Sequence, residues 1–390
     1  MLKTLAIANY RSLRDVRLAL GPLNLITGAN GCGKSSVYRS FQLLASAGRG
    51  GIIPGLAREG GIESTLWAGS EQGALRQLRK GQPVEGTLRS EPKSLRLGFA
   101  TEDFGYQIDL GHPPSSPPLT SPFDLDPAIK CEAIWHGPTL RPGTLLAERR
   151  GPLLRSRDAE GAWSIVHQDL SAYESLFDAL SDPRSSPELF LLRERLRNWR
   201  FYDHFRSDAE SPARRAQIGT RSFVLDHDGA NLAATLQTIR ELGQPGLLER
   251  AVADAFPGAQ LEIDFSGGRF EVQMRQLGLL RPLAASELSD GTLRYLLLCA
   301  ALLSIRAPEL LVLNEPENSL HPELLPALGR LIRQAAERTQ VLVVSHSLPL
   351  IEALNRDPRC QHHRLEKNGG ETQIAGQDLL SKPSWQWMQR

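Results

Sequence analysis

The sequence predicts an α/β protein whose sheet is flanked by helices, and three observations support this fold class. Short apolar runs at the start of the chain lead into a glycine-rich loop and then into a stretch with helical spacing. After Gly291, helical and strand patterns alternate, which is typical of a parallel sheet with helices on its faces. Two of the later apolar runs end in polar residues, at Asn314-Glu315 and at Ser345-His346.

The expected elements follow in chain order. Apolar runs separated by polar residues and by turn signals predict strands, two of which form a hairpin around Thr101–Gly105. The predicted strands are Leu2–Ala8, Val16–Leu20, Leu23–Thr27, Leu95–Ala100, Tyr106–Leu110, Glu309–Leu313 and Gln340–Ser345. The predicted helices are Lys34–Ser46, Ser186–Arg200, Asn231–Leu242, Thr292–Ser304 and Pro322–Glu337. The Pro- and Ser-rich run 111–127 predicts an exposed loop.

The composition is that of a globular protein. Of 390 residues, 41% are apolar and 23% are charged, and the net charge of +1 leaves no global field that would attract nucleic acid or a membrane. Four cysteines lie far apart without metal-binding spacing, which favours reduced thiols. The longest apolar run, Tyr295–Ile305, is too short to cross a bilayer, and the N-terminus lacks the pattern of a signal peptide. We therefore expect a cytoplasmic protein without membrane contact.

The glycine-rich loop carries the strongest motif. Gly28–Ser35 reads GANGCGKS and matches the P-loop pattern G-x-x-x-x-G-K-S between a strand and a helix. Lys34 would reach the β- and γ-phosphates, and the Ser35 hydroxyl would bind Mg²⁺. ATP and Mg²⁺ are thus the predicted cofactors. The predicted phosphate-binding residues are Asn30, Gly31, Cys32, Gly33, Lys34, Ser35 and Ser36.

A second motif has the shape of a Walker B segment. The apolar strand that ends in Asn314-Glu315 would deliver Asn314 toward the metal and Glu315 toward the attacking water, as a general base. A Walker B segment normally ends in Asp-Glu, so Asn314 brings no negative charge and should hold Mg²⁺ less firmly. The sequence predicts slow hydrolysis for this reason.

Two further positions fit the same chemistry. Ser289 is a good helix cap, and the helix start at Ser289-Asp290-Gly291 lies 26 residues before Glu315. His346 follows an apolar strand 31 residues after Glu315 and fits a switch histidine that contacts the γ-phosphate. A P-loop, a Ser-x-Gly helix start and a Walker B strand follow one another in this order in ABC-type ATPases.

Four segments together resemble the RecF-like ATPases, relatives of the SMC and OLD proteins within the ABC superclass. They are NLITGANGCGKSS, ELSDGTLRYLLL, LLVLNEPENSLHPELL and VLVVSHS. The resemblance implies a P-loop NTPase of the ABC-ATPase type, with a mixed sheet, flanking helices and a large α+β insertion lobe. The implied domains are a split core at 1–50 and 255–360, a lobe at 51–254, and a C-terminal hairpin and tail at 361–390. Unlike SMC proteins the chain has no long coiled coil, and the 44 residues after His346 are too few for a Toprim nuclease.

The resemblance also implies partners. It predicts a homodimer that closes head-to-tail around ATP, in which Ser289 and Gly291 of one copy complete the site of the other copy's Lys34. Arg11, in the first turn, would lie near the nucleotide base. The implied role is ATP hydrolysis in DNA double-strand break repair, recombination or genome defence, with a partner protein or nuclease. A second interpretation stays open: an ATP-gated regulatory or assembly protein that controls a partner enzyme without DNA contact.

A DNA surface is the least specific of these predictions. Arg193, Arg197 and Arg200 would share one helical face, and residues 193–221 hold eight basic and four acidic side chains. A solvated helix face explains the same pattern. Glu317 and His321, four residues apart, suggest either a metal pair or residues that shape the loop at the dimer interface.

Overall fold

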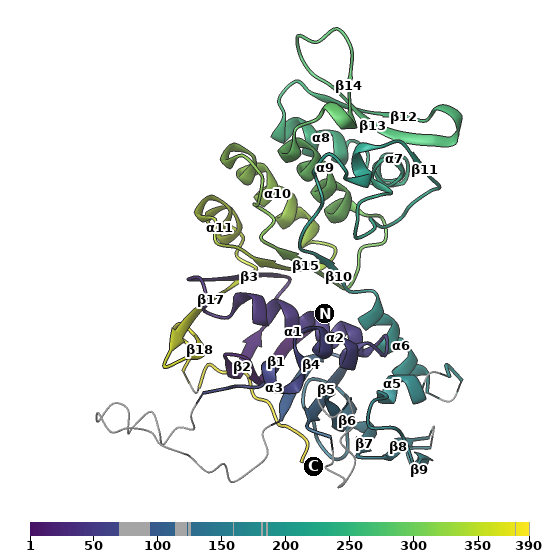
Figure 1. Ribbon diagram of the computed structural model, residues 1–390, viewed down its shortest axis with the longest axis vertical. Helices are drawn as coiled ribbons and strands as arrows, with labels where there is room; N and C mark the ends of the chain where they lie inside the picture. The colour runs from purple at the N-terminus through teal and green to yellow at the C-terminus, as the bar shows by residue number, and fades with distance from the viewer. Residues whose placement is uncertain are drawn as a thin grey trace. The chain divides into compact units, whose positions relative to one another are not determined.

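The fold is known from a computed structural model (Figure 1). The structure describes residues 1–69, 94–113, 123, 126–158, 160–180, 182–184, 186–378 and 380–389. The chain forms two compact units. Unit 1 comprises Met1–Gly21, Thr27–Trp199 and His363–Arg390, and unit 2 comprises Pro22–Ile26 and Arg200–His362.

Unit 1 is built on an antiparallel sheet of eight strands in the order β2-β1-β4-β5-β6-β7-β8-β9. Its strands are β1 (Leu2–Tyr10), β2 (Leu13–Ala19), β4 (Leu95–Thr101), β5 (Phe104–Gly111), β6 (Ala128–His136), β7 (Leu145–Arg150), β8 (Leu153–Arg157) and β9 (Trp163–His167). Its helices are α1 (Lys34–Ala47), α2 (Ile52–Arg58), α3 (Gly61–Thr65), α5 (Leu176–Ala179) and α6 (Pro187–Arg197). Most residues of β1, β4 and β6 are buried, so these central strands are covered on both faces of the sheet.

Unit 2 contains the parallel strands that the alternating pattern predicts. They are β3 (Leu23–Gly28), β10 (Arg200–Tyr202), β15 (Leu310–Asn314) and β16 (Gln340–Val344), paired in the order β10-β15-β16-β3. The helices are α7 (Leu232–Leu242), α8 (Leu247–Ala255), α9 (Asp290–Leu303), α10 (Leu325–Ala335) and α11 (Leu348–Asn355). Figure 1 shows α10 between α9 and α11. Twelve of the fourteen residues of α9 are buried, so this helix forms the centre of the unit.

Smaller elements complete both units. Unit 2 carries short strands and 3₁₀ turns, namely η1 (Pro212–Arg214), β11 (Gln217–Ile218), β12 (Gln260–Asp264), η2 (Ser266–Gly268), β13 (Arg269–Arg275), β14 (Leu283–Ala284), η3 (Ala285–Glu287) and η4 (Pro322–Leu324). The C-terminal hairpin pairs β17 (Cys360–Asn368) with β18 (Glu371–Ile374).

Most predicted elements are confirmed to within a few residues, and one placement is wrong. The helix expected over 186–200 ends at Arg197, and Arg200 begins β10 instead. Arg200 therefore does not share a helical face with Arg193 and Arg197. Most of the predicted loop 111–127 lies outside the described residues. None of the helices in the described ranges combines the length and apolarity that a membrane crossing requires.

The compact units have other boundaries than the predicted domains. β1 pairs with β4 in register from Leu5↔Phe99 to Ala8↔Arg96, so the first strands join strands from the predicted lobe in one sheet. The sequence does not reveal this pairing, because 85 or more residues separate the partner strands. The functional division into core and lobe stays a prediction.

Candidate functional site

The P-loop of unit 1 has the local geometry of an anion site. It leads into α1, whose cap is Gly33 with φ 108° and whose first turn contains no acidic residue. The backbone N–H groups at this helix start are therefore available to an anion. Lys34 is 7% exposed, and its Nζ donates to the carbonyl oxygens of Gly28 (2.7 Å) and Ala29 (3.2 Å). The ammonium thus lies inside the loop.

The C-terminal hairpin holds the P-loop from outside. The buried Thr372 hydroxyl donates to the Cys32 carbonyl oxygen at 2.7 Å and lies 2.8 Å from the Ser12 hydroxyl. A Cβ atom at Gly33 would lie 2.5 Å from this Thr372 oxygen, in a backbone conformation that other residues rarely adopt. Position 33 therefore requires glycine. The motif predicted the glycine, and the structure adds the residue that makes it necessary.

The other predicted residues of unit 1 lie as follows. Asn30 and Ser35 are exposed, Ser36 is half-buried and Cys32 is buried. The Arg11 guanidinium donates to Glu59 Oε2 from both Nε (3.2 Å) and Nη2 (2.7 Å). Arg11 is therefore held by a carboxylate of its own unit, and its role near a nucleotide base stays a prediction.

Unit 2 brings Glu315 and His346 together at the carboxyl ends of two adjacent parallel strands. Asn314 of β15 is in register with Val344 of β16, so the residues after both strands leave the sheet at the same edge. His346 Nδ1 lies 3.7 Å from Glu315 Oε1, while Glu315 Oε2 accepts a hydrogen bond from Asn318 Nδ2 at 3.0 Å. The two predicted catalytic residues of this unit are neighbours.

Glu315 adopts an unusual backbone conformation. Its φ angle is 48°, which lies in the left-handed region. This conformation is energetically unfavourable for any residue other than glycine. The Glu315 N–H donates to the Val344 carbonyl oxygen at 2.8 Å, which ties this turn to the neighbouring strand. Such conformations persist only where surrounding contacts impose them, and they cluster at functional sites.

Glu317 is the residue of this cluster whose role sequence reasoning left open. Its buried Oε1 accepts hydrogen bonds from the Ser345 hydroxyl (2.6 Å) and from the backbone N–H groups of His346 (2.9 Å) and Ser347 (3.2 Å). The carboxylate thus fixes the turn that carries His346. His321 is 70% exposed and does not accompany it, and no group of three or more His, Cys, Asp or Glu side chains in the described ranges could hold a metal ion.

Arg294 of α9 approaches the same cluster from the helix side. It is 2% exposed, and its Nη2 donates to the Glu315 carbonyl oxygen at 3.5 Å. Burial lowers the pKa of the Arg294 guanidinium, and the carboxylates of Glu317 and Asp203 oppose this shift. Two buried atoms here, Arg294 Nε and Glu317 Oε2, have no hydrogen-bond partner among the described residues. No sequence pattern pointed to this arginine, because it lies on an otherwise apolar helix.

The two predicted metal ligands, Ser35 and Asn314, carry oxygen donors of the kind that Mg²⁺ prefers. The Ser35 hydroxyl and the Asn314 amide oxygen are hard oxygen donors, and neither side chain has a hydrogen-bond partner among the described residues. Mg²⁺ at nucleotide sites takes one or two protein ligands and completes its shell with phosphate oxygens and water. The neutral pair supplies no charge of its own.

The helix start at Ser289 is capped as predicted. The Ser289 hydroxyl accepts a hydrogen bond from the Thr292 N–H at 3.2 Å. Ser289 is exposed, and its backbone has the extended conformation of a cap residue. The backbone N–H groups of Asp290 and Gly291 have no acceptor among the described residues. This end of α9 can therefore accept an anion.

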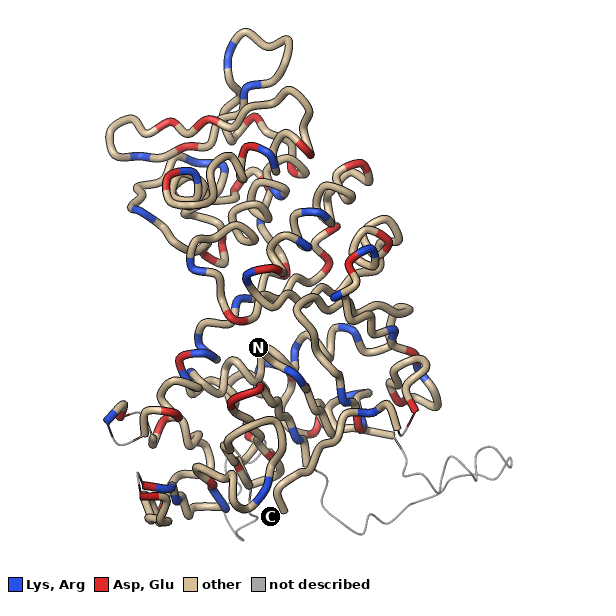
Figure 2. Tube along the Cα trace, turned by 180° about the vertical axis from the view of Figure 1, so that it is seen from behind, with Lys and Arg blue, Asp and Glu red and all other residues tan. Residues whose placement is uncertain are grey.

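Most of the arginines of residues 193–221 form ion pairs with carboxylates. Figure 2 shows basic and acidic residues interspersed along the chain. Ion pairs join Arg193 to Asp178, Arg197 to Glu194, Arg206 to Asp208, Arg215 to Glu210 and Arg221 to Glu241. Pairing of this kind reduces the charge that the set could offer to a phosphate backbone.

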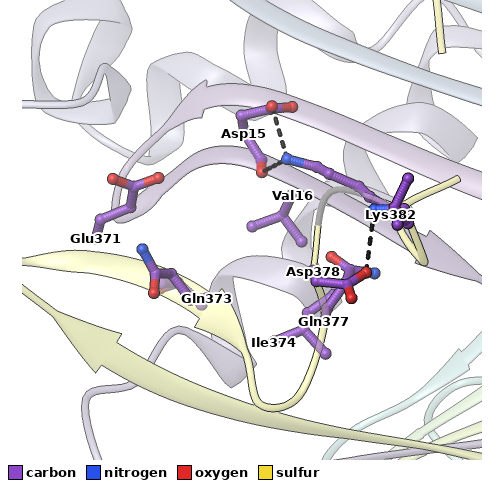
Figure 3. Close-up of a pocket in the computed structure, with 10 residues that line it drawn as sticks. Asp15, Val16, Glu371, Gln373, Ile374, Gln377, Asp378 and Lys382 are labelled. Carbon is purple, nitrogen blue, oxygen red and sulfur yellow. Dashed lines mark hydrogen bonds and ion pairs between the residues drawn. The ribbon is translucent and has the colours of Figure 1, made fainter. Parts of the chain in front are cut away.

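A cavity of about 540 Å³ lies beside the C-terminal hairpin in unit 1. Figure 3 shows Lys382 directed at Asp15, with Nζ 2.7 Å from the carboxylate. Thr372 is among the lining residues, so the strand that forms this wall is also the one that contacts the P-loop. Two arginines outside the lining approach its carboxylates: Arg17 contacts Asp15, and Arg14 lies 3.8 Å from Glu371.

Comparisons with known proteins agree with this geometry. The family described as "AAA domain, putative AbiEii toxin, Type IV TA system" matches residues 147–352, and the family described as "AAA ATPase domain" matches residues 1–52. The OLD nuclease of Thermus scotoductus is 48% identical over 44 residues, which are 11% of this chain and 8% of that protein. The chain thus spans a small part of this relative.

Solved structures of SMC head domains also align with the chain. The SMC head domain from Thermotoga maritima aligns with a TM-score of 0.44 and 16% identity, covering 97% of this chain and 99% of that chain. The Smc head domain with an extended coiled coil bound to the C-terminal domain of ScpA, derived from Pyrococcus furiosus, has a TM-score of 0.48 and 12% identity, with coverage of 96% and 95%.

The first of the two families covers more than half of the 390 residues, including α9, both strand ends and the Glu315–His346 pair. The second covers the P-loop. The chain therefore belongs to the family of AAA domains described with the putative AbiEii toxins, and it is an ATPase-type protein, as its motifs predict.

Proposed function

We propose that this protein binds ATP at the P-loop and hydrolyses it within a head-to-tail dimer. The observation that carries the proposal is the Glu315–His346 pair at the ends of β15 and β16. The chain itself links this edge to the P-loop, because Ile26 is in register with Val344 and Gly28 follows Ile26 by only two residues.

In the proposed reaction each residue has one task. Lys34 binds the β- and γ-phosphates, and Glu315 accepts a proton from the water that attacks the γ-phosphate. His346, 52% exposed, donates a hydrogen bond to a γ-phosphate oxygen. Ser35 and Asn314 would hold Mg²⁺, which would supply positive charge to the phosphates. Because Asn314 adds no charge, turnover is slow.

The dimer follows from the free end of α9. Its unpaired N–H groups at Asp290 and Gly291 suit a phosphate, and Ser289 supplies a hydroxyl beside them. We propose that they bind the γ-phosphate on the P-loop of a second copy. The cytoplasm, where ATP is abundant, is the expected compartment.

A mixing experiment tests the dimer. Ser289→Arg should bind ATP but neither dimerise nor hydrolyse it, and Lys34→Ala should not bind ATP. Mixed, they form heterodimers with both lesions at one site and neither at the other, so hydrolysis should reappear. Ser266→Arg, at an exposed serine of the same unit, is the matched control and should keep full activity. Wild-type hydrolysis by Ser289→Arg alone would refute the proposal.

We further propose that the ATP-bound dimer acts on DNA, in break repair, recombination or genome defence. The resemblance to the OLD nuclease supports this role. The intramolecular ion pairs of the arginines at 193–221 favour the second candidate, an ATP-gated regulator of a partner enzyme or nuclease. DNA binding measured with ATP at increasing salt separates them, since phosphate contacts weaken steeply with salt.

A further inference from the structure

Arg214 is a buried arginine whose guanidinium joins two segments of the chain, 207–208 and 285–290. It ends η1 and is 8% exposed. Its three nitrogen atoms all donate hydrogen bonds: Nε to the carbonyl oxygens of Ser207 (2.9 Å) and Asp208 (3.2 Å), Nη1 to those of Ala285 (3.1 Å), Ser286 (3.3 Å) and Leu288 (2.6 Å), and Nη2 to Asp290 Oδ1 (2.6 Å).

These contacts fix the backbone that leads into α9. Three carbonyl oxygens of the segment 285–288 turn toward one guanidinium, and the next residue, Ser289, takes the extended cap conformation. Arginine carries five N–H donors on three nitrogen atoms in a rigid planar fork, whereas lysine has three donors on a single nitrogen and cannot make all of these contacts. The position and direction of the α9 N-terminus thus depend on Arg214.

The contact with Asp290 has an electrostatic consequence. Asp290 is the first residue of α9, and its side chain is 61% exposed. A carboxylate in the first helical turn stabilises the helix, but it repels a phosphate that approaches the same N–H groups. The guanidinium of Arg214, 2.6 Å away, balances this charge.

We propose that Arg214 is a positioning residue that prepares the α9 N-terminus to receive the terminal phosphate of ATP bound to a second copy of this chain. It holds the loop 285–288 in place and neutralises Asp290. This inference rests on the proposed head-to-tail dimer. Beyond that dimer, it names the residue that prepares the N-terminus of α9 to bind a phosphate.

The test uses the full chain with Arg214→Gln, Arg214→Lys, Asp290→Asn and the double variant Arg214→Gln/Asp290→Asn. ATP affinity, the ATP-dependent dimer in sedimentation, hydrolysis and thermal unfolding are measured for each. Arg214→Gln should keep its ATP affinity, because its own P-loop is intact, and weaken the ATP-dependent dimer at least tenfold. Arg214→Lys should be intermediate, since it keeps the charge and loses the fork.

Two readouts separate positioning from a merely structural role. The double variant should dimerise better than Arg214→Gln, because removing the Asp290 charge removes the unbalanced repulsion. A mixture of Arg214→Gln with Lys34→Ala should regain hydrolysis, since each chain supplies what the other lacks. Arg215→Gln, at an exposed neighbour, is the control and should behave as the unmodified protein.

The outcomes that overturn the inference are distinct from failure of the dimer itself. If the unmodified protein does not dimerise with ATP, the proposed function fails. If it does, and folded Arg214→Gln dimerises equally well, Arg214 has no positioning role. If Arg214→Gln does not fold, Arg214→Lys decides: unmodified dimer affinity in that folded variant also overturns the inference.

Discussion

The buried carboxylate of Glu317 accepts the backbone N–H of His346 at 2.9 Å and so holds the turn that follows β16. Glu317→Ala would leave the Ser345 hydroxyl and the His346 N–H without this acceptor, at a cost of about 1–3 kcal/mol for each buried donor, while the Ser347 N–H keeps the Ser345 hydroxyl oxygen at 3.1 Å. We expect ATP binding to persist and kcat to fall roughly tenfold to a hundredfold. Glu317→Gln, which keeps one acceptor oxygen, should lose less.

Steady-state hydrolysis and ATP titration of these variants check the expectation. Glu323→Ala, at a residue whose side chain is 87% exposed, is the matched control. Unchanged kcat in a folded Glu317→Ala protein would show that the turn keeps its shape without the carboxylate.

The metal site offers a gain-of-function test. Asn314→Asp adds the negative charge that the site lacks, so we expect hydrolysis to rise about tenfold, equivalent to about 1.4 kcal/mol of transition-state stabilisation. The dependence of the rate on Mg²⁺ concentration should shift to lower concentrations. Glu315→Gln should be inactive both alone and combined with Asn314→Asp. Equal rates with Asn and Asp at position 314 would contradict the argument.

The contact between Thr372 and the P-loop predicts that a substitution far from the loop in sequence weakens ATP binding. Thr372→Val keeps the shape and removes the hydroxyl that donates to the Cys32 carbonyl oxygen, so ATP should bind about fivefold to tenfold more weakly, as expected for about 1–1.5 kcal/mol. Thr372→Ser keeps the hydroxyl and is the control. Equal dissociation constants for the Val and Ser proteins would remove the hairpin from nucleotide binding.

The buried ion pair of unit 1 predicts a pH-dependent stability. Arg149 and Glu132 are fully buried 3.6 Å apart, and burial raises the pKa of the Glu132 carboxyl while Arg149 opposes the rise. Arg149→Met should lower the free energy of unfolding by about 3–5 kcal/mol, because it leaves a buried charge alone.

The pH dependence of this loss has a definite sign. Without the arginine the folded-state pKa of Glu132 rises further above its unfolded value, so the folded state binds the proton more tightly. Stability is then greatest below the unfolded pKa and is lost as pH rises through the folded pKa. Urea unfolding of Arg149→Met at pH 5 and pH 8 should show the larger loss at pH 8. Arg150→Met, at an exposed neighbour, should change little at either pH.

Local sequence patterns predicted the helices and strands and the segments that carry the candidate site residues, because each of these patterns lies within one short stretch of sequence. The P-loop, the Ser289 cap and the strand before Glu315 are examples. The residues that hold these segments in place were not predicted, since their contacts join positions that are distant in the sequence. Thr372 lies 340 residues from Cys32, and Arg214 lies 74 residues from Leu288.

The strands β6 to β9 were missed for a related reason. β7 reads LLAERR, whose charges suggest a surface, yet Glu148 and Arg149 are buried. Their partners, Arg155 and Glu132, come from neighbouring strands, so burial becomes plausible only once the pairing is known. The hydropathy of one segment does not show that a charged side chain in it is paired with an opposite charge on a neighbouring strand.

The left-handed backbone conformation of Glu315 implies a conflict between thermal stability and ATP hydrolysis. A non-glycine residue in that region costs about 1–3 kcal/mol, and glycine would relieve much of it. A random search for more heat-resistant variants should therefore recover Glu315→Gly, with the general base deleted. Under the proposed mechanism, selection for turnover maintains the glutamate at this turn, whereas selection for thermal stability alone would replace it.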